Sequence, residues 1–380
     1  MLLCGFLAEF WTFLRTARGS QWNYFVWCLL NAHAGTSCPP SAWNVPPGGC
    51  GYEPLRPGAP APPLLLLTAD GLSSPEAQRA FGALLKEAAA QRANHSDAGW
   101  SASLTLAGDP AGRNMSAALG QRGVLFVCDA AYDAHLTMPD AFPSCSTYCS
   151  RRRAELVALG ATAVVCLLLG REAQDVVAGD SGSTRPELAY NFSDADVAGL
   201  LGVAAGVFVE GGSALVLLRA LRRPLEAAPG GRGPSFGDLV RARVANRTLA
   251  YVGVSAGSIV AGETASVSLI WSPHGAKGIG WNFTGLRLVE KCAFLPHFQP
   301  KEEGWLERYT HDLRAGLGAD PACPDCGAMG LPQCQPLSWS QAPRSSAGGG
   351  PGGDGGGTTS ASWKLRYLCP YYRPAWASWA

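Results

Sequence analysis

The stretch that decides the fold is Leu249-Ala250-Tyr251-Val252-Gly253-Val254-Ser255-Ala256-Gly257. Its first half is an apolar run typical of a buried strand, and helix-compatible residues follow it. This order predicts a nucleophile elbow: a serine on a sharp turn between strand and helix, with glycines two residues away on each side to relieve crowding. The backbone N–H of Ala256 would then point to where an oxyanion forms. G-x-S-x-G alone is a weak pattern in a chain with 47 glycines, so the strand-turn-helix context carries the prediction.

Apolar runs alternate with helical segments outward from this turn. Strands are expected at 64–68, 124–128, 161–168 and 206–209, and helices at 76–92, at 151–159 and shortly after residue 194. Such alternation predicts an α/β fold, a three-layer sandwich with a mostly parallel sheet covered on both faces. In these sheets ligands gather at the carboxyl ends of the strands. Ser255 and the pair Gly211-Gly212 both fall there.

The two ends of the chain differ in composition from the middle. Residues 1–34 are expected to be a signal or targeting segment, because Arg15 and Arg18 precede an apolar run that is too short to span a bilayer, and Ala32-His33-Ala34 resembles a cleavage site. Residues 35–63 form a Pro/Gly-rich arm, and 64–342 form the α/β domain. Residues 343–362 are a Gly-rich flexible insert. The aromatic tail, 363–380, is left open between a strand and an unstructured end.

Composition excludes several partners. The chain has 30 basic and 29 acidic residues, so no global field favours nucleic acid or an anionic membrane. We expect a small peptide substrate, no nucleic-acid partner, no stable membrane span, and a homodimer as the candidate assembly. Five N-x-S/T sequons would suit a secreted or endomembrane protein, but a cytoplasmic location stays equally open; the sequons begin at Asn94, Asn114, Asn191, Asn246 and Asn282.

The thirteen cysteines do not form a metal-binding pattern. Cys323-Pro324-Asp325-Cys326 has no second pair at zinc-ribbon distance, and Cys145 and Cys149 have no histidine nearby. We therefore predict no metal and no cofactor, and expect loop disulfides or free thiols.

Four blocks of sequence, taken in their order along the chain, indicate a family. They lie at residues 66–72, 207–215, 251–262 and 294–298. Together they resemble the peptidase E and cyanophycinase family of serine peptidases, whose fold is like that of the class I glutamine amidotransferases. The resemblance covers roughly residues 64–315. The combination of blocks is far more specific than any one of them.

The resemblance implies a role for each block. Ser255 would be the nucleophile and His297 the general base, a pair that the chemistry needs because a serine hydroxyl is a poor nucleophile until an imidazole takes its proton. Gly211 and Gly212 would join the amide of Ala256 in binding the oxyanion. The family commonly has Asn or Asp where this chain has Ser213. His274, in a Ser-Pro-His-Gly loop, is interpreted as a surface residue.

The resemblance leaves open which acid would orient His297. Glu263 is the candidate that we name, with Glu290, Glu302 and Glu303 as others. Family members often have an acid after a Gly-Leu-Pro-like segment, and here Gln333 stands after Gly330-Leu331-Pro332. The triad would then be a dyad, or another carboxylate would substitute. Losing this acid costs a serine protease about four orders of magnitude in turnover.

The residues around His297 favour the peptidase E side of the family, whose members cleave dipeptides with an N-terminal aspartate. Leu295-Pro296 precede the histidine, where cyanophycinases have Asp-Gln, and no arginine cluster follows. Arg287 and Arg308 could bind a substrate carboxylate, but both also fit a solvated surface.

Three other functions compete with the peptidase. A catalytically impaired, amidotransferase-like binding protein would explain Gln333 and the Gly-rich insert. An α/β-hydrolase esterase would need an H-G-G-G-like loop and a histidine far downstream, whereas His297 lies only 42 residues after Ser255. A glutamine amidotransferase would need a cysteine at position 255.

Overall fold

A computed structural model of the chain describes residues 61–94, 119, 121–131, 145–170, 192–228, 231–267, 283–298, 309–311, 327–331, 337–341 and 363–367. Several expectations fall outside these residues: the targeting segment and most of the arm (1–60), the C-x-x-C at 323–326, Gln333 and the Gly-rich segment 343–362.

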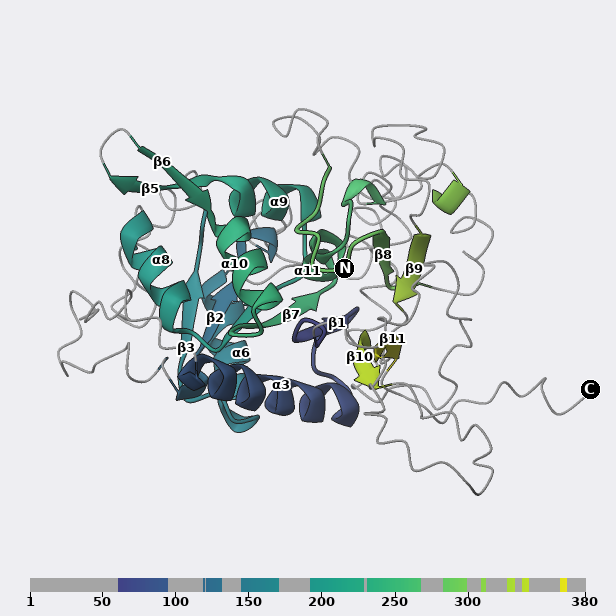
Figure 1. Ribbon diagram of the computed structural model, residues 1–380, viewed down its shortest axis with the longest axis horizontal. Coiled ribbons are helices and arrows are strands. Elements are labelled where there is room, and N and C mark those ends of the chain that lie inside the picture. Colours follow the sequence, from purple (N-terminus) through teal and green to yellow (C-terminus); the bar gives the residue numbers. More distant parts are fainter. Residues whose placement is uncertain are drawn as a thin grey trace, which may run out of the picture.

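A seven-stranded sheet forms the centre of the protein (Figure 1), in the order β11-β10-β1-β7-β4-β2-β3. Five of its strands run parallel, and they are β1 (Leu65–Thr68), β7 (Ala250–Val254), β4 (Gly206–Val209), β2 (Val124–Val127) and β3 (Val164–Leu167). Two antiparallel strands extend the β1 edge, β10 (Leu337–Gln341) and β11 (Trp363–Tyr367). The start of the aromatic tail, left open by the sequence, is therefore a strand of this sheet.

Helices cover both faces of the sheet. One face carries α3 (Pro75–Asn94) and α6 (Cys145–Ala158). The other carries α8 (Asp194–Val203), α9 (Ala214–Arg222), α10 (Phe236–Ala245) and α11 (Ala256–Ala261). Successive strand residues alternate between the two cores, so Val207 and Val209 pack on the α9 side and Phe208 on the α6 side. Helices on both faces of a mostly parallel sheet confirm the predicted three-layer α/β fold. The strands are buried on both faces, which accounts for their continuously apolar runs.

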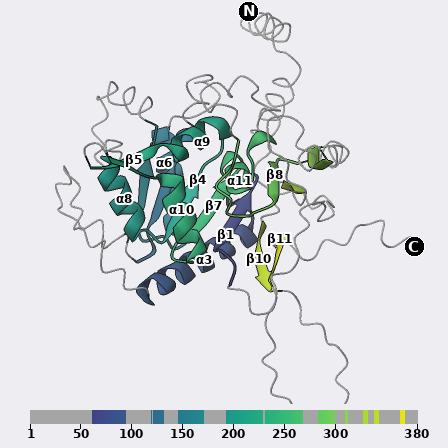
Figure 2. The same cartoon turned by 45° about the horizontal axis from the view of Figure 1, so that its top comes forward.

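Two smaller strand pairs lie outside the main sheet. β5 (Pro224–Ala228) and β6 (Gly231–Ser235) form an antiparallel hairpin, and β8 (Cys292–Pro296) runs parallel to β9 (Gly327–Leu331). β8 packs beside α11, as two views show (Figures 1 and 2). This packing brings the residues that follow β8 toward the carboxyl end of β7.

Capping boxes start two of the helices. The Ser193 hydroxyl accepts the Asp196 amide at the start of α8, and Ser235 does the same with Asp238 at α10. The Ser213 hydroxyl caps α9 by accepting the amide of Val216. The short helix after residue 194 was predicted, whereas α10 was not, although Ser235 and Asp238 have the spacing of a capping box.

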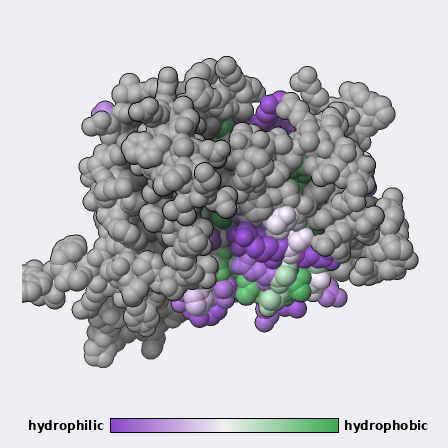
Figure 3. All heavy atoms as spheres, turned by 180° about the vertical axis from the view of Figure 1, so that it is seen from behind, coloured by the Kyte–Doolittle hydropathy of each residue, from purple (hydrophilic) through white to green (hydrophobic). Residues whose placement is uncertain are grey.

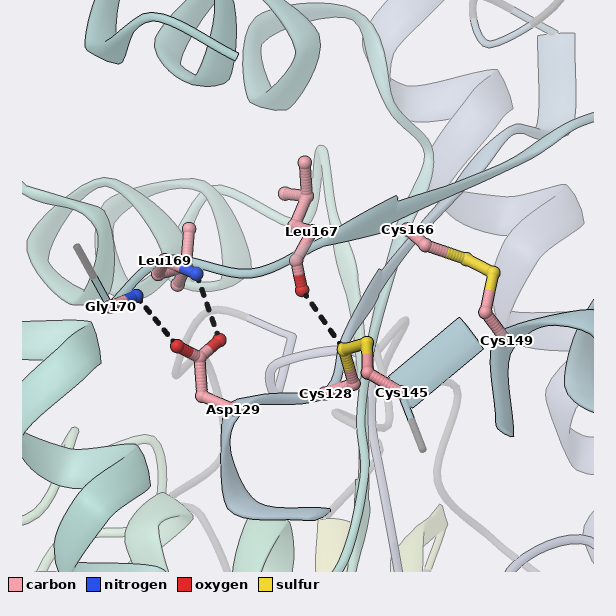
Figure 4. Close-up of a disulfide and its surroundings, with 8 residues drawn as sticks. All are labelled: Cys128, Asp129, Cys145, Cys149, Cys166, Leu167, Leu169 and Gly170. Atoms are coloured by element: carbon pink, nitrogen blue, oxygen red, sulfur yellow. Dashed lines mark hydrogen bonds between the residues drawn. A yellow bond between two sulfur atoms is a disulfide. The ribbon is translucent and has the colours of Figure 1, made fainter. Parts of the chain in front are cut away.

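Two disulfides fasten α6 to the sheet (Figure 4). Cys128, directly after β2, is bonded to Cys145, and Cys166 of β3 is bonded to Cys149; the Cα–Cα distances are 5.8 Å and 6.1 Å. The expectation of loop disulfides or free thiols is corrected for these four cysteines, because both bonds join a helix to strands or their ends. α6 begins six residues before the predicted helix, and these added residues include Cys145 and Cys149.

A buried carboxylate joins the ends of β2 and β3 beside these disulfides. Asp129 accepts hydrogen bonds from the amides of Leu169 (3.0 Å) and Gly170 (2.7 Å), as Figure 4 shows. Burial raises the pKa of Asp129 to about 6, although these two amides favour the charged form.

Figure 3 shows one face of the described residues. Seen from behind, hydrophilic side chains dominate their visible part, with a smaller hydrophobic patch next to them (Figure 3). The exposed large hydrophobic side chain among them is Val157 of α6. Within the described ranges no helix has the length and apolar character to cross a membrane. Those same residues include no group of three or more His, Cys, Asp or Glu side chains suited to a metal ion.

Candidate active site

Ser255 occupies a single-residue turn between β7 and α11. Its backbone has φ 47° and ψ −105°, and its amide donates to the carbonyl oxygen of Thr68 at the end of β1 (2.9 Å). A non-glycine residue with positive φ is strained and persists only where its surroundings hold it. The turn lifts the half-buried Ser255 side chain to the carboxyl edge of the sheet.

The two glycines that flank Ser255 are required by close backbone contacts. A Cβ on Gly257 would lie 2.3 Å from the carbonyl oxygen of Val209, and one on Gly253 would lie 2.7 Å from that of Gly257. Tyr251 supports the turn from within the core, because its hydroxyl donates to the carbonyl oxygen of Gly257 (2.7 Å). The glycine spacing of the sequence pattern therefore has a steric reason.

His297 meets Ser255 across the site. Its Nε2 lies 3.0 Å from the Ser255 Oγ. His297 follows β8 directly and also has positive φ, 56°. The two residues are 42 positions apart in the chain, and the packing of β8 on α11 brings them together. The hydrogen bond has the geometry of a nucleophile and its base.

The protein holds the imidazole in its neutral form. Desolvation lowers the pKa of His297 to about 4, since a buried ring is costly to charge. At neutral pH, Nε2 can therefore accept the proton of the Ser255 hydroxyl.

Gly211, one of the predicted oxyanion groups, lies beside Ser255. A Cβ added to Gly211 would sit 3.0 Å from the Ser255 Cβ and 3.6 Å from its Oγ. Gly212 has φ 132° and faces the carbonyl oxygen of Ala130, which a Cβ would approach to 2.1 Å. Ala256 is the first residue of α11, where amides have no acceptor within the helix. The Gly211 amide, in contrast, already donates to Glu210 Oε1 (3.0 Å).

The structure does not bring Glu263 to this pair. One of its carboxylate oxygens contacts Arg287 Nε (2.9 Å) and the other accepts the Lys291 amide (3.3 Å). The Glu263 amide donates to the carbonyl oxygen of Cys292, at the start of β8, whereas His297 follows the end of that strand. At about 3.3 Å per residue, the two ends of the five-residue β8 are roughly 13 Å apart.

Other sequence candidates are either exposed or not described. Glu290 is exposed at the turn before β8, and Arg287 is 45% exposed while paired with Glu263. Glu302, Glu303, Arg308 and His274 lie outside the described residues.

Three residues that no sequence motif indicated also hold the site. Ser258 accepts the Thr68 amide (3.1 Å), and its hydroxyl lies 2.8 Å from the carbonyl oxygens of both Thr68 and Gly253. Glu210 and Arg152 form a buried ion pair beside Gly211 (3.0 Å). The position of Glu210, between a strand and a glycine pair, was a usable signal. Nothing near Arg152 in the sequence indicates its partner.

A mostly parallel α/β sheet with a serine and a histidine paired at its carboxyl edge defines a hydrolase-like site. Residues 189–318 match the model of peptidase family S51. This match confirms the resemblance to peptidase E-like proteins over the part of the chain that contains Ser255 and His297, and it supports a serine peptidase.

Solved structures offer a weaker likeness. One is described as a putative peptidase E protein from Listeria monocytogenes EGD-e, with 16% identity, a TM-score of 0.37, and coverage of 72% of this chain and 92% of that one. Another is a peptidase from an acI-B1 Actinobacterium, with 14% identity, a TM-score of 0.42, and coverage of 72% and 81%. No curated protein matches the chain in sequence.

Proposed function

We propose that this protein is a serine-type hydrolase that cleaves small peptides, with a preference for Asp-X dipeptides. The observation that supports it best is the 3.0 Å distance between Ser255 Oγ and His297 Nε2 on a strand-turn-helix element. The match to a peptidase family over the same region adds support. The aspartate preference rests on the peptidase E-like pattern around His297.

The reaction would pass through an acyl-enzyme. Ser255 Oγ attacks the scissile carbonyl carbon, and its proton moves to His297 Nε2. Amides of Ala256 and of the Gly211-Gly212 turn stabilise the oxyanion. The C–N bond then breaks, and His297 gives its proton to the leaving amine. A water molecule, deprotonated by His297, attacks the ester, releases the acid and restores the Ser255 hydroxyl.

Labelling with a fluorophosphonate probe tests the nucleophile. Wild-type protein should be labelled and Ser255→Ala should not, because the probe reacts with activated serines. Ser193→Ala is the matched control: Ser193 is exposed and caps α8 by accepting the Asp196 amide, so this variant should keep the label if it folds. A folded wild-type protein that takes no label would contradict the hydrolase and favour the binding-protein alternative.

Substrate profiling tests the specificity. We expect turnover of Asp-X dipeptides to exceed that of the matched Asn-X dipeptides and of p-nitrophenyl esters. The Asn-X series keeps size and shape while removing the charge. Efficient ester cleavage without dipeptide activity would support the esterase instead.

A further inference from the structure

Glu210 is an acidic residue in a place where a charge is costly. It follows β4 directly and precedes the glycine pair, its amide donates to the carbonyl oxygen of Val127 (3.0 Å), and its side chain is 5% exposed. A buried carboxylate is retained only where hydrogen bonds or a countercharge compensate for lost water. Each of its oxygens has such a partner.

The two oxygens of Glu210 link the glycine turn to α6, which covers the opposite face of the sheet from α9. Oε1 accepts the Gly211 amide (3.0 Å), and Oε2 accepts Arg152 Nε (3.0 Å). The bond from Oε1 fixes the plane of the peptide group between Glu210 and Gly211. Gly211 in turn lies against Ser255, where even an added methyl group would come within 3.0 Å of the Ser255 Cβ. A small rotation of this peptide would therefore change the space around the nucleophile.

Arg152 is itself firmly held. Its Nη1 pairs with Glu155 one turn away on α6 (2.6 Å), and its guanidinium lies over the ring of Phe208, 5.8 Å from the centroid. Its Nη2 reaches the loop after β1, where a Cβ on Gly71 would lie 2.9 Å away. The side chain is 14% exposed. Arg152 thus spans the loops that follow β1 and β4, the two strands on either side of β7.

We propose that Glu210 and Arg152 are positioning residues for the active site. This inference rests on the proposed function. Arg152 holds Glu210, and Glu210 holds the Gly211 amide, so that the glycine turn keeps its place beside Ser255.

Substitutions at both ends of the pair test this role. Glu210→Ala should slow fluorophosphonate labelling of Ser255 and lower kcat on a dipeptide by about 10- to 100-fold, with KM changed less than about threefold, because misplacement of a catalytic group by about 1 Å can cost 100-fold. Glu210→Gln keeps an acceptor for the Gly211 amide and should recover most of the rate. Arg152→Met keeps much of the side-chain length and should lower the rate at least about fivefold.

Asp194→Asn is the matched control. Asp194 forms a comparably buried ion pair with Arg223 (2.6 Å), between the start of α8 and the end of α9. This variant should lose thermal stability and keep the wild-type labelling rate. Equal slowing in Asp194→Asn and Glu210→Ala would show a general structural effect and overturn the positioning role.

The outcomes distinguish failure of the positioning role from failure of the proposed hydrolase function. Labelling of wild type with an unchanged rate in Glu210→Ala overturns the positioning role alone. A wild-type protein that takes no label overturns the proposed function and, with it, this role. Circular dichroism shows whether Glu210→Ala folds. If it does not, Arg152→Met tests the proposal in its place, and a wild-type labelling rate in that variant overturns the proposal.

Discussion

Ser255 and His297 both have positive φ angles, 47° and 56°, and their side chains meet at 3.0 Å. Such conformations cost of order 1–3 kcal/mol each in non-glycine residues. Each residue directly follows a strand, where the chain must turn sharply to aim a side chain across the sheet edge. The strain and the hydrogen bond occur at the same two residues, as expected of a site built for function.

The low pKa of His297 predicts how activity depends on pH. Activity needs the neutral imidazole, and burial lowers the pKa of this ring from 6.5 to about 4. The labelling rate of Ser255 should therefore stay high as pH falls through 6.5 and drop to half near pH 4. The unfolded chain takes up this proton first, so the contribution of His297 to stability is full above pH 6.5 and declines from there toward pH 4. A half-point of labelling near 6.5 would contradict the buried, neutral ring.

Gly212→Ala should destabilise the protein through its backbone. The new Cβ would lie 2.1 Å from the carbonyl oxygen of Ala130, at a φ of 132°, and a loss above about 2 kcal/mol is expected. Gly160→Ala is the control, because its φ of 106° is also unfavourable but its nearest contact is 3.7 Å away. Thermal unfolding should show the larger loss for Gly212→Ala. Equal losses would mean that the contact with Ala130 contributes nothing.

Removing either disulfide of α6 should lower stability. Each closes a loop of sequence separation 17, which in the chain-entropy treatment contributes about 3 kcal/mol. We expect the variant Cys128→Ala/Cys145→Ala to unfold at lower temperature than wild type, and Cys149→Ala/Cys166→Ala likewise. Reductant should lower the Tm of wild type by more than it lowers the Tm of a variant in which all four of these cysteines are replaced by alanine. The same Tm for wild type with and without reductant would argue against these bonds.

Glu263→Gln should change the labelling rate of Ser255 less than about tenfold. Both Glu263 oxygens bind groups other than His297, so the substitution breaks an ion pair with the 45% exposed Arg287 and leaves the imidazole in place. Such an ion pair contributes about 1 kcal/mol or less. A loss near four orders of magnitude, as expected for a triad acid, would show that Glu263 orients His297.

The fold was predictable from sequence because its strands are buried on both faces. Runs such as 64–68 and 206–209 are continuously apolar, and the residues between them have helical spacing, so the layers follow directly. Ser255 was predictable because Gly253 and Gly257 mark the turn locally. His297 needed the family pattern, since no local rule tells which later strand returns to the nucleophile.

The remaining parts depend on contacts between distant segments. Arg152 and Glu210 are 58 positions apart, and their pairing becomes evident only when α6 lies against β4. The pairing of four cysteines across α6 has the same cause. Glu263 was chosen because it follows the elbow in sequence, but the chain turns it toward Arg287 and the start of β8.

The order of the strands also bears on how the protein is made. β1 pairs with β10, as in Leu66 with Ser338, and β10 pairs with β11 near residue 365. When the five parallel strands have left the ribosome, β10 and β11, which cover the β1 edge of the sheet, have not yet been synthesised. Until synthesis reaches residues 337–367, β1 presents an unpaired edge. A nascent chain stalled before that point should therefore depend on chaperones to avoid aggregation.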